Sequence, residues 1–395
     1  MTKPDFDEII DRRGTLCSKW DDMQAAYGVL AEDDGLAMWV ADMDFRPPAA
    51  VQRAVEAVAA HGVYGYPGAH APYLAAIGWW MANRHGWDIR PGWVLTCAGL
   101  VNGVAMALEA CTGPGDGVAV MSPVYHAFGR IVRATGRTLL ELPLADRDGR
   151  YHMDWPRWET MMTGRETMLI LCSPHNPGGR VWTPDELREV AAFCRRHDLI
   201  LVSDEVHCDL VMPGAPAHTV TALAAPEIAN RLVTLNAATK TFNIAGAHLG
   251  NAIIADDDLR ARFRAALAAR AISPGMFGMD MVAAAYSPEG AAWVDALVAY
   301  LDGNRRLFDR GVNAIPGLRS MPLEATYLSW VDFSGTGMAP AEFIARVEKT
   351  ARIAANHGAT FGAGGDSFLR FNIATPRARV AEAVARLTDA FADLQ

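Results

Sequence analysis

The sequence has few of the features that accompany binding to nucleic acids or membranes. Its basic residues do not form clusters, and its net charge is −9 at pH 7. No apolar run approaches the roughly 18 residues that a membrane-spanning helix needs. We therefore expect neither nucleic acid nor membrane among its partners.

Cysteine is scarce, and its spacing suggests no special chemistry. The six cysteines show no CxxC motif and no zinc-type pairing. Scattered cysteines of this kind are typical of reduced packing residues in a cytoplasmic protein. The segment 1–8 also lacks the apolar stretch of a signal peptide, so we expect a cytoplasmic location.

The sequence does contain many apolar residues, and their pattern predicts the fold. Hydrophobic residues make up 51% of the 395 positions, enough for two domains. Between residues 49 and 287, strand-like segments alternate with helical ones. This favours an α/β fold with a mainly parallel, seven-stranded sheet flanked by helices. The strands are predicted at 93–96, 117–121, 138–142, 167–172, 199–203, 232–235 and 250–254, and the helices at 49–61, 71–85, 99–112, 125–135 and 184–197.

The pattern becomes less regular after residue 287, which suits a separate α+β domain. We predict a large domain over 49–287 and a smaller one formed by 1–48 and 288–395. The elements expected in the C-terminal part are helices at 289–313, 340–357 and 376–394 and strands at 326–331 and 368–373.

Lys240 lies between the short apolar strand 232–235 and the small residues 244–246. A lysine buried there would have a lowered pKa. Its neutral amine would then suit a Schiff base with an aldehyde. The alternative is a surface lysine whose ammonium group extends into water, and the local sequence does not decide between the two.

Two acids, Asp204 and Glu205, directly follow the buried strand 199–203. An unpaired buried carboxylate is costly, so at least one of them must meet a cation. That cation could be a protonated pyridine nitrogen, a basic side chain, or a metal held together with His207. The spacing matches no known zinc pattern, and we expect no metal.

Three further strand ends carry groups that a ligand could use. Asn176 lies in a loop with two prolines and two glycines, 173–179, which is either a ligand-binding or a structural turn. The turn at 97–101 exposes helix N-terminal amides that suit a phosphate, although it lacks the lysine of a Walker loop. Tyr125 could stack on a flat ring or pack at the rim of the site.

Arg370 is placed inside the apolar strand 368–373. A buried arginine needs an anionic partner, and its planar fork fits a carboxylate. An internal ion pair is the alternative. Taken together, an amine, a phosphate turn, an acid for a pyridinium and an arginine for a carboxylate describe a site for pyridoxal 5'-phosphate and an amino-acid substrate.

Over nearly its whole length the chain resembles the fold type I pyridoxal phosphate enzymes of aminotransferase class I/II. More closely it resembles the MalY/PatB-type cystathionine β-lyase (C–S lyase) branch. The tryptophan and the Asp-Met-Asp-Phe run within 38–45 favour this branch over plain aminotransferases. The other matching segments are 65–66, 123–125, 151–154, 172–177, 179–182, 203–207, 240–246, 325–328 and 370–374.

The resemblance implies roles for the candidate residues. Lys240 would bind the cofactor aldehyde and later act as the general base. Asp204 would pair with the pyridine nitrogen, and Tyr125 would stack on the ring as a catalytic residue. Asn176 would bind the phenolic oxygen of the ring or the substrate carboxylate. Arg370 would bind the α-carboxylate of the substrate.

The remaining implied contacts concern the phosphate and the entrance of the site. The backbone at 99–101 would hold the phosphate, and Tyr66 would reach the phosphate of the neighbouring subunit, so the resemblance implies a homodimer with active sites at the interface. Thr239 stands where the family usually has serine and keeps the hydroxyl group. The other expected residues are Gly99, Leu100, Val101, His207 and Thr239 for the cofactor, and Tyr64 and Trp39 for the substrate.

The implied reaction is the α,β-elimination of L-cystathionine or related cysteine S-conjugates to a thiol, pyruvate and ammonia. The same residues would also serve an aminotransferase acting on an L-amino acid. The two reactions diverge only after Lys240 has removed the α-proton. A non-catalytic protein that uses this fold to bind a partner is a third alternative.

Overall fold

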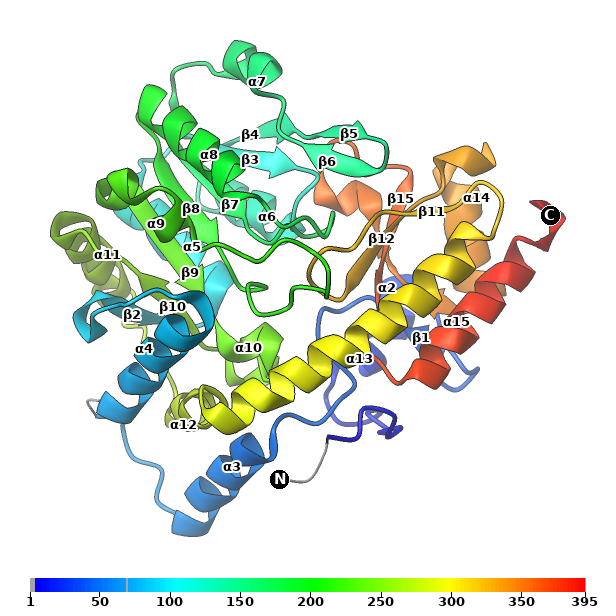
Figure 1. Cartoon of the computed structure of the whole chain (residues 1–395), viewed down its shortest axis with the longest axis horizontal. Coiled ribbons are helices and arrows are strands. Elements are labelled where there is room, and N and C mark those ends of the chain that lie inside the picture. The colour runs from blue at the N-terminus through cyan, green and yellow to red at the C-terminus, as the bar shows by residue number, and fades with distance from the viewer. Residues whose placement is uncertain (1–3, 69, 395) are drawn as a thin grey trace.

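The computed structural model describes residues 4–68 and 70–394, and its largest feature is a seven-stranded sheet (Figure 1). The strands run in one direction except β10, which is antiparallel to both of its neighbours. The predicted mainly parallel, seven-stranded sheet is therefore confirmed. Across the sheet the strands are β2 (Val94–Cys97), β10 (Gly250–Ile253), β9 (Leu232–Asn236), β8 (Ile200–Asp204), β7 (Glu166–Cys172), β3 (Gly117–Ser122) and β4 (Thr138–Pro143).

Both faces of this sheet are covered, which explains its uninterrupted apolar strands. Along β7, Leu169 and Leu171 belong to one buried cluster, together with Leu187 of the helix that comes next in the chain. Met168 and Ile170 point the other way and belong to a second cluster. The helices around the sheet are α3 (Ala49–His61), α4 (Ala71–His85), α5 (Leu100–Cys111), α6 (His126–Ala134), α7 (Trp155–Met161), α8 (Pro184–Arg196), α9 (Thr221–Ala224), α10 (Ala238–Thr241), α11 (Asp257–Ala269) and α12 (Met276–Ala285).

Helix α8 shows how closely local sequence fixes an element. Thr183 accepts a hydrogen bond from the backbone of Glu186, and the Glu186 carboxylate accepts one from the backbone of Thr183. This reciprocal cap satisfies two amides that the helix leaves free. The predicted start of the helix at Pro184 is confirmed.

A second, antiparallel sheet lies in the C-terminal part of the chain, beside the long helix α13 (Figure 1). The division into domains at 49–287 remains a prediction. The elements of this part are β11 (Arg319–Ser320), β12 (Leu328–Asp332), β14 (Asn356–His357), β15 (Phe368–Asn372), α13 (Pro288–Asn313), α14 (Pro340–Ala345) and α15 (Arg377–Ala390).

The helix predicted over 340–357 is wrong in its second half. The helical backbone ends at Thr350 after a π-helical turn, and Arg352 has a φ of +53°. The next two residues form β13 (Ile353–Ala354), which pairs in parallel with β1 (Leu36–Ala37). Pairing with a distant segment thus replaces the continuation of the helix, and it anchors the N-terminal segment to the C-terminal part.

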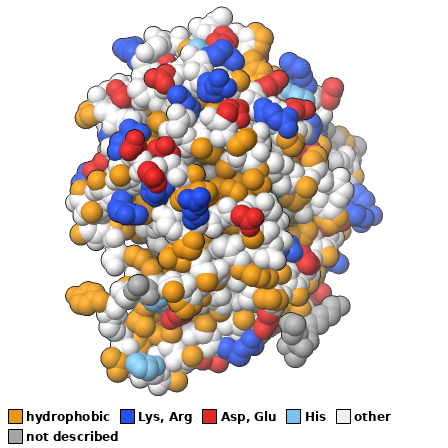
Figure 2. Space-filling model, turned by 60° about the vertical axis from the view of Figure 1, so that its left-hand side comes forward, with side chains coloured by type: hydrophobic (Ala, Val, Ile, Leu, Met, Phe, Trp, Pro, Cys, Tyr) orange, Lys and Arg blue, Asp and Glu red, His pale blue; other side chains and the backbone are white. Residues whose placement is uncertain are grey.

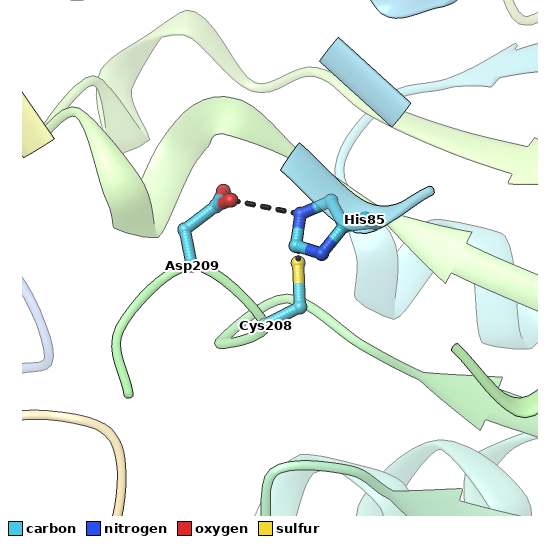
Figure 3. A group of neighbouring side chains, drawn as sticks. All are labelled: His85, Cys208 and Asp209. Atoms are coloured by element: carbon cyan, nitrogen blue, oxygen red, sulfur yellow. Dashed lines mark hydrogen bonds and ion pairs between the residues drawn. The ribbon is translucent and has the colours of Figure 1, made fainter. Parts of the chain in front are cut away.

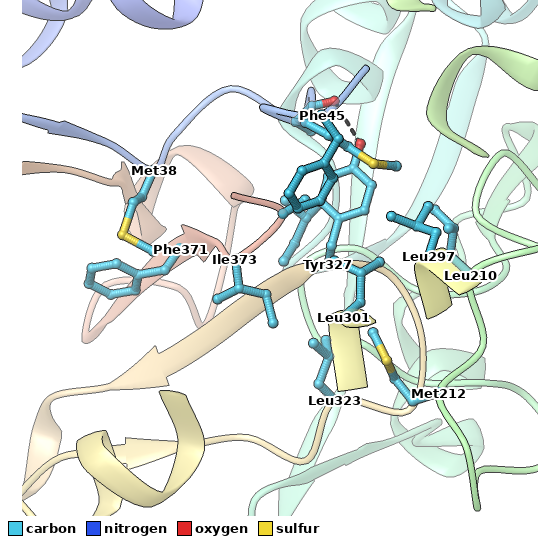
Figure 4. Packing of buried hydrophobic residues seen from close by; sticks show 14 of the residues in the cluster. Met38, Phe45, Leu210, Met212, Leu297, Leu301, Leu323, Tyr327, Phe371 and Ile373 are labelled. Atoms are coloured by element: carbon cyan, nitrogen blue, oxygen red, sulfur yellow. Dashed lines mark hydrogen bonds between the residues drawn. The ribbon is translucent and has the colours of Figure 1, made fainter. Parts of the chain in front are cut away.

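The same N-terminal segment packs into the largest buried cluster. Figure 4 shows Met38 next to Phe371 of the C-terminal part. Phe45, Tyr327 and Leu210, which follows the large sheet's β8, belong to the same buried cluster. Each such side chain contributes about 1.5–3 kcal/mol of burial free energy. Three distant parts of the sequence therefore share one core, and segment 38–45 lies between the two sheets.

Candidate active site

The candidate site forms where the carboxyl ends of neighbouring strands meet. β7, β8 and β9 are adjacent in the sheet, and they lead into the segments that carry Asn176, Asp204 and Lys240. Open α/β sheets bind ligands at this edge. Across from it, β15 contributes Arg370, so the site lies between the two sheets.

Lys240 points inward and is not a surface lysine. Its Nζ donates a hydrogen bond of 2.6 Å to the carbonyl of Ala41, and the hydroxyl of Tyr327 donates to the same oxygen at 2.9 Å. Burial lowers the pKa of Lys240 to about 8, because a desolvated ammonium is disfavoured. An amine with this pKa can act as a nucleophile and as a base near neutral pH.

Asp204 is a buried carboxylate that has no cationic partner within 4 Å among the described residues. Only 4% of it is exposed, and one oxygen accepts a hydrogen bond of 3.1 Å from the backbone of Val206. Burial raises the pKa of Asp204 to about 7. A bound cation, such as a protonated pyridine nitrogen, would offset the free energy that burial of the ionised carboxylate costs.

The adjacent acid, Glu205, has a structural role. It accepts hydrogen bonds from His218 at 3.1 Å and from the backbone of Thr221 at 3.0 Å. The alternative of a metal held by Asp204, Glu205 and His207 finds no support, since these three are not grouped as ligands in the described part of the chain.

Arg370 is the opposite case, a buried cation without a carboxylate. It is 2% exposed and donates hydrogen bonds to the side chains of Asn176, at 2.9 Å, and Asn356, and to the carbonyl of Trp39 at 3.0 Å. Its Nε has no partner. Arg370 forms no ion pair with any carboxylate in 4–68 or 70–394, since its hydrogen bonds go to two asparagines and a carbonyl. The internal ion-pair alternative is therefore wrong, and the guanidinium is free to bind a ligand carboxylate.

Two further groups face this space. The Nδ1 of His207 is buried and has no hydrogen-bond partner in the described structure, and burial lowers the pKa of His207 to about 3. Its imidazole is therefore neutral and able to bind a polar ligand atom. Tyr125 is half-buried at the start of α6, and burial raises its pKa, with Arg370 and Asp204 among the charges that act on it.

A cradle for an anion lies at the N-terminus of α5. Gly99 has a φ of +85°, and no atom lies within 4 Å of the position a Cβ would take. The first-turn amides of a twelve-residue helix need acceptors from outside the helix. The neighbouring backbone amide of Ala98 already donates to the side chain of Asn102. The backbone amides of 99–101 are therefore the ones that would bind a phosphate.

These observations fit pyridoxal phosphate with an amino-acid substrate. Asp204 needs a cation, Arg370 needs a carboxylate, and the α5 terminus needs an anion. Lys240 supplies an amine among them, and Thr239, which precedes it, is half-buried. Pyridoxal phosphate carries a pyridine nitrogen for Asp204 and a phosphate for α5, and an amino acid carries the carboxylate for Arg370.

The structure does not bring three of the predicted residues into the site through their side chains. Tyr64 is 58% exposed and Tyr66 fully exposed, both in the loop 62–68. The indole of Trp39 donates to the carbonyl of Lys19 at 2.8 Å, so only its backbone carbonyl reaches Arg370. Exposed apolar side chains gather over the lower part of the face in Figure 2. The large apolar side chains that are exposed include Val63, Tyr64, Tyr66 and Phe277.

Some contacts of the site had no signal in the sequence. Ala41 acts through its carbonyl, which any residue would offer. Asn356 lies within the wrongly predicted helix. Phe361 lies 4.8 Å from the Arg370 guanidinium, ring centre to Cζ, and an isolated phenylalanine does not predict such a contact.

Comparison with known proteins agrees with this geometry. A family model described as aminotransferase class I and II matches residues 39–387. Cystathionine beta-lyase PatB of Bacillus subtilis (strain 168) is 37% identical over 385 residues, 97% of this chain and 98% of that protein. Protein MalY of Escherichia coli (strain K12) is 30% identical over 391 residues, covering 98% of each. The crystal structure of cystalysin from Treponema denticola, which contains a pyridoxal 5'-phosphate cofactor, has a TM-score of 0.94 and 33% identity and covers 100% of both chains.

Proposed function

Because this chain belongs to the aminotransferase class I and II family, we propose that it is a pyridoxal 5'-phosphate-dependent carbon–sulfur β-lyase. Its reaction is the α,β-elimination of L-cystathionine or related cysteine S-conjugates to a thiol, pyruvate and ammonia. The observation that carries the proposal is a pair of buried groups without a counter-ion, Asp204 and Arg370, both of which act electrostatically on Lys240. The lyase branch is favoured because PatB, a cystathionine beta-lyase, is similar over 97% of this chain.

The residues that would hold the cofactor follow from their charges. Lys240 would carry it through Nζ, Asp204 would receive the pyridine nitrogen, and the amides at 99–101 would hold the phosphate. His207 and Tyr125 face the same space and would contact the ring. When bound, pyridoxal phosphate supplies a sink for the electrons released at the substrate α-carbon.

The chain's own residues would then position the substrate and move its proton. Arg370 binds the α-carboxylate, while Asn176, which accepts a hydrogen bond from the guanidinium, keeps that guanidinium oriented. Lys240 takes the α-proton at Nζ, since a pKa of about 8 leaves part of the amine neutral near pH 7. The carbonyl of Ala41 accepts a hydrogen bond from Nζ and so directs the amine into the site.

We also propose a homodimer whose sites lie at the interface, and a cytoplasmic location. Tyr66 is fully exposed beside other exposed apolar residues of loop 62–68, and such a patch is typical of protein interfaces. A partner's loop would bring its Tyr66 to the phosphate. For the location, all six cysteines are free thiols. No helix in the described ranges has the length and apolarity needed to cross a membrane.

A product assay tests the reaction. Purified holoenzyme with L-cystathionine alone should release homocysteine, pyruvate and ammonia in equal amounts. An aminotransferase would instead form a keto acid only after a 2-oxo acid acceptor is added, with no free thiol. That second result would overturn the lyase assignment while leaving the cofactor site intact.

A further inference from the structure

Two loops that carry the central residues of the site are tied together by side-chain hydrogen bonds. Segment 205–209 comes directly after Asp204, and segment 236–241 contains Lys240. The amide of Asn236 donates to the Cys208 sulfur at 3.2 Å, and the hydroxyl of Thr241 donates to Asp209 Oδ2 at 2.8 Å. The two bonds lie on either side of Lys240 in the sequence.

Asp209 is the centre of this connection. Its oxygens accept hydrogen bonds from the Trp80 indole at 3.0 and 3.2 Å, besides the bond from Thr241. Figure 3 shows the ring of His85 between Asp209 and Cys208, with its Nε2 at 2.8 Å from Asp209 Oδ1. The carboxylate side chain is only 1% exposed. One buried acid thus joins α4, the loop after β8 and helix α10.

A metal site is the other use to which these side chains could be put. Ligand atoms of His85, Cys208 and Asp209 lie within 4.8 Å of one another. However, a carboxylate has about four acceptor positions, and Trp80, His85 and Thr241 already make four contacts with the two Asp209 oxygens. Cys208 likewise accepts from Asn236. The group is therefore a satisfied hydrogen-bond network, which supports a structural connection and not a cation.

The helix that carries Lys240 depends on this network. α10 has four residues and no side-chain cap at Ala237, and a helix this short is not stable by itself. Thr241 directly follows Lys240, so its bond to Asp209 fixes the end of the helix next to the amine. Asp209, the acceptor of this hydrogen bond, lies in the loop that directly follows Asp204. The bond therefore links the segment of Lys240 to the segment of Asp204.

We propose that Asp209, acting through Thr241, is a positioning residue that sets the Lys240 amine relative to Asp204. This inference rests on the proposed function, in which both groups hold one cofactor. A shift of about 1 Å in such a group can lower a rate by 10²-fold. Losing the Thr241 hydroxyl should therefore change the chemistry of Lys240 more than the stability of the fold.

Thr241→Val tests the proposal in the holoenzyme. It removes the hydroxyl that donates to Asp209, while the volume of side chain 241 and the charge of Asp209 stay nearly the same. We expect kcat to fall about tenfold or more with KM nearly unchanged. We also expect the pKa of the cofactor absorbance, measured by titrating the holoenzyme without substrate, to shift. Thr241→Ser should restore both values.

Thr234→Val is the matched control. Thr234 is buried on β9, 1% exposed, and its hydroxyl has no partner in the described structure, so both values should stay as in the wild type. The proposal is overturned if Thr241→Val lowers only the melting temperature, or if Thr241→Ser behaves like Thr241→Val. If the lyase assignment fails, the absorbance of the bound cofactor can still be titrated, because this measurement needs no turnover. The failure of one proposal is therefore distinguishable from the failure of the other.

Discussion

Two regions of the site lack partners, but in different ways. One is the set of buried residues Asp204, Lys240 and Arg370, which form the floor of the site, and the other is the exposed loop 62–68. On the floor, Asp204 and Arg370 are buried with good hydrogen bonds and lack counter-ions. In the loop, Tyr64 and Tyr66 carry no charge and are 58% and fully exposed. Buried charge without a counter-ion indicates a small charged ligand. Exposed aromatic surface indicates another protein chain.

In the proposed homodimer, this difference divides the site into a part that one chain would complete and a part that a second chain would supply. The floor is fixed by the sheet, by segment 38–45 and by the Asp209 network. Among the described residues, the loop is contacted through Tyr64, which lies against Phe277 with ring centres 5.5 Å apart and reaches the carbonyl of Ala59. Changes on the floor should therefore affect chemistry or charge, and changes in the loop should affect the partner's contribution.

The largest effect is expected from Lys240→Ala. Without the amine there is no attachment point for the cofactor aldehyde and no base for the α-proton, so turnover should fall by roughly 10³-fold or more. The cofactor absorbance near the visible edge should disappear with it. Lys349→Ala, at an exposed lysine, should leave both unchanged. Retained turnover in Lys240→Ala would show that another group acts as the base.

Arg370→Met should have the next largest effect. It removes the buried guanidinium but keeps an unbranched side chain, so the substrate carboxylate loses its partner. We expect kcat/KM to fall by about 10²-fold or more, mainly through KM, while the absorbance of the bound cofactor persists. Arg310→Met, at an exposed arginine, serves as the control. An unchanged KM would place the carboxylate elsewhere.

The smallest effect is expected from Asp204→Asn. Unlike the two changes above, which lower activity, it should raise the stability of the apoprotein. Because burial raises the pKa of Asp204 to about 7, the folded state binds a proton that the unfolded chain has already released. Stability therefore falls as pH rises from near 4 to near 7, and the cost is complete above that range.

The asparagine has no charge to bury, and its side-chain oxygen can still accept the hydrogen bond from the backbone amide of Val206. We expect the melting temperature of the apoprotein to rise by about 2 °C or more near pH 8 and to change little near pH 4. Asp88→Asn, at an exposed acid, should show no such pH dependence. A destabilised Asp204→Asn apoprotein at pH 8 would mean that Asp204 is already compensated by the protein.

The prediction of the floor rests on residues that follow strands, because parallel strands end at one edge. The two residues by themselves do not tell which of Asp204 and Glu205 faces the ligand, since neighbouring residues of a strand point to opposite sides; only the family resemblance implied Asp204. Only the structure shows that Glu205 turns to His218. Lys240 was also ambiguous from its neighbours, and its burial depends on Ala41, about 200 positions away.

The errors have the same origin in distant contacts. The pattern over 340–357 is locally helical, but Ile353–Ala354 pairs with Leu36–Ala37, and no local signal carries that pairing. The anchoring of Lys240 by the Ala41 carbonyl was missed because a backbone oxygen leaves no mark in the sequence.

Mixing two inactive variants tests the division of the site most directly. Lys240→Ala lacks the floor amine, and Tyr66→Ala lacks the aromatic that a partner should provide. If each site combines the floor of one chain with the loop of another, mixed dimers hold one complete site. Denaturing and refolding the two variants together with pyridoxal phosphate should then restore up to roughly a quarter of wild-type lyase activity. No recovery, in a mixture shown to contain mixed dimers, would contradict a shared site.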